Sequence, residues 1–193
     1  EAFLDEKQVP VTYTYYAAPK LVPAVYMLAT IPNWSKYELQ SGKVKVFRNN
    51  TYIGESYIEQ NNFFDTLTFS VARVDDVAIE RRLVNSNQKG HLLNLKDKVT
   101  REWQIVVKNN KQTSVDLEVE DLYPVSREKG IKVDLIDAGG AQHYESSGKL
   151  RWKLNLKPGE KRELRYTYQV TVKNAEDYDI EDFLEDEDEY END

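Results

Sequence analysis

Residues 148–174 alternate between apolar and polar side chains on both sides of a Lys-Pro-Gly-Glu turn. Successive side chains of a β-strand point to opposite faces, so the pattern predicts two strands with one buried and one solvated face each. The apolar positions are Leu150, Trp152, Leu154, Leu156, Leu164, Tyr166, Tyr168, Val170 and Val172. Such regularity specifies a structure closely and says little about an activity.

Three earlier segments repeat this alternation. Their inward positions are Trp103, Ile105 and Val107, then Val115, Leu117 and Val119, then Ile131, Val133 and Leu135. Turn-forming residues such as Asn109-Asn110 and Gly139-Gly140 separate the runs. The predicted fold class is therefore all-β, made of antiparallel β-sandwich modules, the C-terminal one immunoglobulin-like. Trp103 and Trp152 share the inward parity, so we expect both in the core.

The first half of the chain is also rich in strands. The runs "GKVKVF" and "TYIGESYI" flank Arg48-Asn49-Asn50 and predict a hairpin, while "DTLTFSVAR" and "VAIERRLV" predict two further strands. The run "AVYMLATI" is apolar on both faces, as in a strand covered on both sides. We predict an N-terminal β module over 1–90, the immunoglobulin-like sandwich over 91–175, and an acidic tail over 176–193.

The net charge of −8 comes from the C-terminal tail. Of the 34 acidic residues, 12 lie in 176–193, so the rest of the chain holds 22 against 26 Lys and Arg. A block of like charge normally stays solvated, although a calcium site or a basic partner is an alternative for it. At the start of the tail, Tyr178, Ile180, Phe183 and Leu184 are expected to dock on the body.

Several chemistries find no support in the sequence. The chain has no Cys, and its two histidines, His91 and His143, stand far apart outside any metal or nucleophile motif. It has no phosphate-binding loop, no G-x-S-x-G motif, and no apolar run of membrane-spanning length. Basic residues on the outward face of 149–165 are typical of strands whose lysines discourage edge-to-edge aggregation, and not of a nucleic-acid surface. We therefore predict no catalytic, cofactor-binding or metal-binding residues, no nucleic-acid partner and no membrane span.

A set of segments carries a family resemblance. These are "AVYMLATIPNWSKYELQSGKVKVFRNNTYIGESYI", "DTLTFSV", "TREWQIVVKNNKQTSVDLEVEDLYPVS" and "GKLRWKLNLKPGEKRELRYTYQV", in this order and spacing. They resemble the C-terminal part of the domain of unknown function found in mucoidy-inhibitor A-like bacterial proteins, over residues 9–174. The resemblance implies an exported protein of the periplasm or cell surface and supplies no catalytic residues. The chain is accordingly interpreted as a fragment or processed form of a larger protein.

Aromatic residues outside the alternating strands are the candidates for a contact surface. Trp34 lies between strands, Tyr57 lies in a predicted strand, and Phe63 and Phe64 share a polar loop where both cannot point inward. The leading hypothesis is a non-catalytic module that contacts a protein partner or the rest of its parent chain. The alternatives are a carbohydrate-binding module and an uncharacterised hydrolase. A flat row of exposed rings would favour sugar, and an isolated tip would favour protein.

Overall fold

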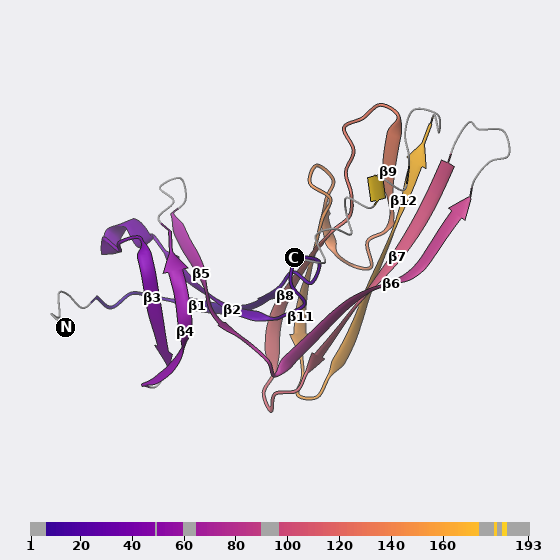
Figure 1. Ribbon diagram of the computed structural model, residues 1–193. Helices are drawn as coiled ribbons and strands as arrows, with labels where there is room; N and C mark the ends of the chain where they lie inside the picture. The colour runs from indigo at the N-terminus through magenta and orange to yellow at the C-terminus, as the bar shows by residue number, and fades with distance from the viewer. Residues whose placement is uncertain are drawn as a thin grey trace.

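The computed structural model describes residues 7–48, 50–59, 65–89, 97–173, 180 and 183–184. In this part of the chain the fold is almost entirely β-structure, apart from the short 3-10 helix Trp34–Tyr37 and the helical residues 180 and 183–184 (Figure 1). The strands are β1 (Thr12–Ala17), β2 (Tyr26–Pro32), β3 (Gly42–Arg48), β4 (Thr51–Ile58), β5 (Thr66–Arg73), β6 (Val77–Lys89), β7 (Asp97–Asn109), β8 (Val115–Leu122), β9 (Ile131–Asp137), β10 (Gln142–Tyr144), β11 (Lys149–Leu156) and β12 (Lys161–Val172). They form sheets in the orders β10-β11-β8-β1-β2-β5, β6-β7-β12-β9 and β3-β4. The all-β prediction is confirmed.

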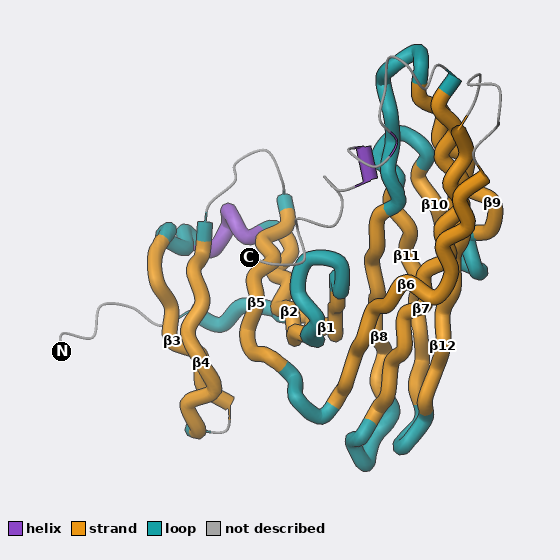
Figure 2. The backbone as a smooth tube through the Cα atoms, turned by 45° about the vertical axis from the view of Figure 1, so that its right-hand side comes forward, coloured by secondary structure: helices purple, strands orange, loops and turns teal. Residues whose placement is uncertain are grey.

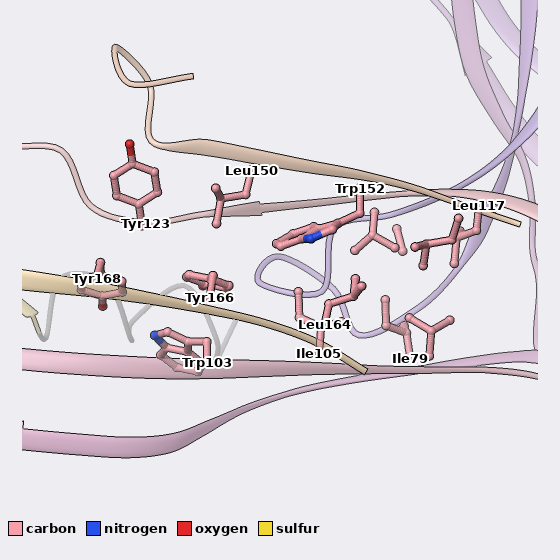
Figure 3. Packing of buried hydrophobic residues seen from close by; sticks show 14 of the residues in the cluster. Ile79, Trp103, Ile105, Leu117, Tyr123, Leu150, Trp152, Leu164, Tyr166 and Tyr168 are labelled. Atoms are coloured by element: carbon pink, nitrogen blue, oxygen red, sulfur yellow. The ribbon is translucent and has the colours of Figure 1, made fainter. Parts of the chain in front are cut away.

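The main core lies between the β8–β11 part of the first sheet and the β6-β7-β12-β9 sheet. Every inward residue predicted on β7, β8, β11 and β12 is buried there, Trp103 and Trp152 included. Trp152 of β11 faces Tyr166 of β12 across the layer, with ring centroids 6.1 Å apart (Figure 3). On β9 the same parity gives less burial, since Val133 and Leu135 are only half-covered. The alternation thus identified the inward face of each strand.

Gln104 shows that an outward position can still be buried. It lies on the outer face of β7, yet it is only 1% exposed. Its side-chain oxygen accepts a hydrogen bond from Arg82 Nε at 2.7 Å, and its amide nitrogen donates to Glu163 at 2.8 Å. Since β7 pairs with β6 on one side and β12 on the other, long side chains from both neighbours cover it.

The six-stranded sheet contains a parallel pair that the sequence did not predict. Strand β1 pairs antiparallel with β2 but parallel with β8, through Tyr15, Tyr16 and Ala17 opposite Leu117, Glu118 and Val119. This short ladder joins the strands of the first half to the sandwich. In Figure 2 the β1, β2 and β5 strands accordingly lie between the β3–β4 hairpin and the sandwich.

A second, smaller core lies under the β3–β4 hairpin. Ile31, Trp34, Ile58 and Leu67 are buried there. The predicted hairpin is confirmed, since β3 and β4 pair antiparallel, with Arg48 opposite Thr51 at the end of the ladder. Two cores fit two β modules, but β6 pairs with β7 of the sandwich, so this sheet spans the predicted boundary at 90. The division into domains stays a prediction.

The start of the C-terminal tail contacts the main core. Ile180 and Leu184 are buried in it, and Phe183 packs against it half-covered. This confirms the expected docking for these three residues, whereas Tyr178 and residues 185–193 lie outside the described residues. Among the described residues, no helix has both the length and the apolar composition needed to cross a bilayer.

Candidate functional site

Two adjoining cavities form a groove between the β3–β4 hairpin and the face of β1, β2 and β5. They share Tyr15, Met27 and Ile53 and have volumes of about 260 and 390 Å³. The smaller cavity is also lined by Tyr13, Val46, Phe47 and Val71, and the larger one by Ala72, Arg73, Val74, Asp75, Asp76 and Lys111. We call the two cavities together the hairpin groove. It has an apolar end and a charged end.

A β-bulge shapes the apolar end. The register of β3 with β4 shifts between Val46, opposite Gly54, and Phe47, opposite Tyr52, and it leaves Ile53 without a direct partner. Neighbouring side chains of a regular strand point to opposite faces, yet Val46 and Phe47 both line the groove. A bulge turns the strand locally and redirects a side chain. The extra residue of this bulge is Ile53 on β4, and its side chain lines the groove together with Val46 and Phe47 of β3.

The rim of the apolar end carries exposed aromatic rings. Phe47 is 60% exposed and Tyr52 is 51% exposed. Their ring centroids lie 5.6 Å apart with an interplanar angle of 65°, an edge-to-face arrangement. Tyr13 on the opposite wall is exposed as well. Apolar surface of this kind at the mouth of a groove is typical of contact sites.

The charged end carries both signs. Arg73 Nε lies 3.0 Å from the Asp75 carboxylate, and Lys111 Nζ lies 5.6 Å from the centroid of the Tyr15 ring. Both side chains of the ion pair are largely exposed, so it contributes little to stability. The cation over Tyr15 links the β7–β8 loop to β1. These groups can orient an occupant by charge while the apolar end supplies contact area.

The other face of β1 is held by a charged network. The Tyr16 hydroxyl donates to Glu120 at 3.0 Å, and Arg151 Nε donates to the same carboxylate at 2.8 Å. Burial acts to raise the pKa of Glu120, but hydrogen bonds from Arg151, Lys149 and Tyr16 hold it below its ordinary value. Burial and the bond to Glu120 raise the pKa of Tyr16 to about 12. The network fixes β1 on β8 and so positions Tyr13 and Tyr15 in the groove.

A buried ion pair lies inside the sandwich. Arg81 Nε of β6 donates to the Asp121 carboxylate of β8 at 2.9 Å, its Nη2 donates to the Tyr166 hydroxyl at 3.0 Å, and its guanidinium lies 3.4 Å from the Trp103 ring centroid. Burial disfavours the cation, but Asp121 and Tyr166 hold the pKa of Arg81 above its ordinary value. Burial also raises the pKa of Asp121, against its contacts with Arg81 and the Leu122 N–H. Both charges are almost fully covered, and the pair joins β6 of one sheet to β8 of the other.

The structure separates the contact candidates taken from the sequence. Trp34 is 4% exposed in the small core, which leaves little of its surface for a partner, whereas Tyr57 is 61% exposed on β4 outside the hairpin groove. Phe63 and Phe64 lie outside the described residues. His143 is exposed, and no group of three or more metal-ligating side chains occurs in the part of the chain described.

Sequence reasoning missed the residues that shape the groove rim. Phe47 and Tyr52 immediately flank the predicted hairpin turn, and Tyr13 lies in the "VTYTYY" run. The sequence signal that indicates this rim is the pair of aromatic residues on either side of the predicted turn. The bulge at Ile53 has no comparable signal in the sequence.

The chain is an all-β module whose described residues form an open groove, with exposed aromatic rings at one end and charged side chains at the other. A family model described as "Domain of unknown function (DUF4139)" matches residues 7–173, and the chain belongs to this family. No curated protein matches the chain.

Proposed function

We propose that this chain is a non-catalytic module of a bacterial cell-envelope protein and that it binds a protein segment, from a partner or from its own parent chain, in the hairpin groove. The observation that carries the proposal is the open groove with exposed aromatic rings at one end and charges of both signs at the other. Aromatic residues in a concave, partly apolar site are typical of protein contacts.

The ring geometry favours a protein segment over a sugar. A carbohydrate platform needs flat rings in one plane, whereas Phe47 and Tyr52 stand at 65° to each other. Edge-to-face rings offer a cleft for an apolar side chain instead of a flat stacking surface. The carbohydrate-binding alternative loses its main geometric support at this site.

The envelope setting, in the periplasm or at the cell surface, is supported by the resemblance to mucoidy-inhibitor A-like proteins. Its test is fractionation of bacterial cells that produce the full-length parent protein. Recovery in the cytoplasmic fraction alone would contradict this part of the proposal.

Site-specific photo-crosslinking in such cells tests the groove. A photoreactive phenylalanine analogue replaces Tyr13 on the groove wall, and in a matched control it replaces Tyr57, which is equally exposed on β4 but outside the groove. We expect a defined protein adduct from position 13 and none from position 57. Adding Phe47→Ser should abolish the adduct, because it removes the ring that lines the groove and packs against Tyr52.

Two outcomes would overturn the proposal. Equal adducts at both positions, or an adduct that survives Phe47→Ser, would show that the groove is not the contact site. Calorimetry with chitohexaose and cellohexaose covers the alternative, since sugar binding lost in Phe47→Ser would assign the groove to carbohydrate.

A further inference from the structure

Strand β9 offers a second surface, remote from the hairpin groove. In the described part of the chain, β9 pairs only with β12 and forms one edge of its sheet. A cavity of about 590 Å³ runs along this edge, lined by residues 131–136 on one side and by 123–126, His143 and Glu145 on the other. We call this cavity the edge groove. Because this groove runs along β9, the core-facing side of this edge strand is open.

The backbone of β9 directs hydrogen-bonding groups to the free edge. Lys173 N–H donates to the Gly130 carbonyl at 2.8 Å, so Gly130 points its carbonyl toward β12. In an antiparallel ladder the direction alternates from residue to residue, so Lys132 and Asp134 also point their backbone groups toward β12. The backbone groups of Val133 and Leu135 therefore point to the free edge, where another strand can pair.

The apolar residues of this edge are incompletely covered. Val133 and Leu135 point inward but are only half-buried, in contrast to their counterparts on β11 and β12. Ile136 is 59% exposed, and it lies at a register shift with β12 that ends the regular part of the strand. An added strand would complete the core along residues 131–135, with its inward side chains in the edge groove.

The sequence of β9 is complementary to itself in one antiparallel register. When two copies pair about a two-fold axis at Val133, Lys132 of each copy lies opposite Asp134 of the other. In the same register Ile131 lies opposite Leu135, and Val133 lies opposite Val133. Opposite charges on directly facing positions stabilise a pair of strands, and a two-fold contact requires this kind of self-complementarity.

We propose that β9 is a homodimerisation edge, at which a second copy of this chain pairs antiparallel about Val133 and joins the two four-stranded sheets into one. The charge pattern favours a second copy over an unrelated strand. Lysine on an edge strand usually guards against pairing, because it would face an apolar or like-charged residue. Here the self-pairing register gives Lys132 an acidic partner, and the exposed Lys132–Asp134 contact within one chain can rearrange to serve both copies.

Sedimentation equilibrium of the 193-residue chain at low salt tests the proposal. We expect a reversible monomer–dimer equilibrium above the 22.5 kDa monomer. In the two-fold register, residues 132 and 134 face each other at two symmetric places. Lys132→Glu or Asp134→Lys alone puts like charges at both places, so each should raise the dissociation constant of the dimer about tenfold or more. The double variant Lys132→Glu/Asp134→Lys restores opposite charges and should regain the wild-type association.

Lys161→Glu is the matched control. Lys161 and Glu163 form an exposed ion pair with the same spacing on β12, away from the edge, so this variant should associate like wild type. Thermal unfolding of every variant checks that the fold is intact. A monomer at all concentrations up to the millimolar range, a dimer insensitive to the single substitutions, or a double variant as weak as the singles would each overturn the proposal.

Discussion

Trp152→Ala tests whether the alternating strands encode a core. Trp152 is almost fully buried against Tyr166, and its indole N–H donates to the Gly139 carbonyl at 3.0 Å. Truncation to Ala leaves a cavity, which costs roughly 3–5 kcal/mol for a large aromatic residue. The lost hydrogen bond adds about 1 kcal/mol. The expected loss of about 4–6 kcal/mol is a large part of the roughly 5–15 kcal/mol by which a domain is stable.

The lost hydrogen bond also affects a tight turn. Gly139 has φ +58°, and a Cβ atom there would lie 1.6 Å from the Arg165 carbonyl oxygen. The Trp152 indole thus holds a turn that packs directly on β12. Trp152→Phe keeps most of the ring but loses the donor, and it should cost less than Trp152→Ala.

Urea unfolding followed by far-ultraviolet circular dichroism measures these losses, since tryptophan fluorescence changes with the substitution itself. Lys153→Ala on the outward face is the control and should cost about 0.5 kcal/mol or less. The outward Arg151 is not a suitable control, because it pairs with Glu118 and Glu120. A loss below about 1 kcal/mol for Trp152→Ala, at an unchanged denaturant slope, would refute the core assignment.

Three further predictions concern pH, metal and the tail. Burial and Glu120 raise the pKa of Tyr16 to about 12 from 10.0, so its stabilising contribution is complete below pH 10 and is lost as the pH rises through about 12. The difference in Tm between wild type and Tyr16→Phe should therefore narrow over this range, and a constant difference would contradict the assignment. Because the sequence has no Cys and only two separated histidines, a chelator should leave the Tm of the purified chain unchanged, and a drop of several degrees would show a structural metal. Deleting residues 185–193 should leave the Tm nearly unchanged at moderate salt, because mutually repelling exposed charges contribute little, whereas a large loss would show that the carboxylates dock or hold a cation.

The alternation of apolar and polar residues within single strands predicted much of the fold. It predicted the all-β class, the β3–β4 hairpin, and the inward positions of Trp103 and Trp152, all of which the structure confirms. These properties are local, because the direction of a side chain depends only on its parity within its own strand. The sequence also predicts the docking of Ile180 and Leu184, because they are large apolar side chains within an otherwise acidic segment.

Only the tertiary structure decided how the strands are arranged and which apolar side chains stay uncovered. The parallel pairing of β1 with β8, the burial of Gln104 and the Arg81–Asp121 pair each depend on segments far apart in the sequence. The hairpin groove depends on a bulge at Ile53 of β4 and on three strands that meet the hairpin from other parts of the chain. Parity fixes which side of a strand is apolar, whereas strand order and local irregularities fix which apolar side chains remain uncovered, and it is the uncovered ones that can bind.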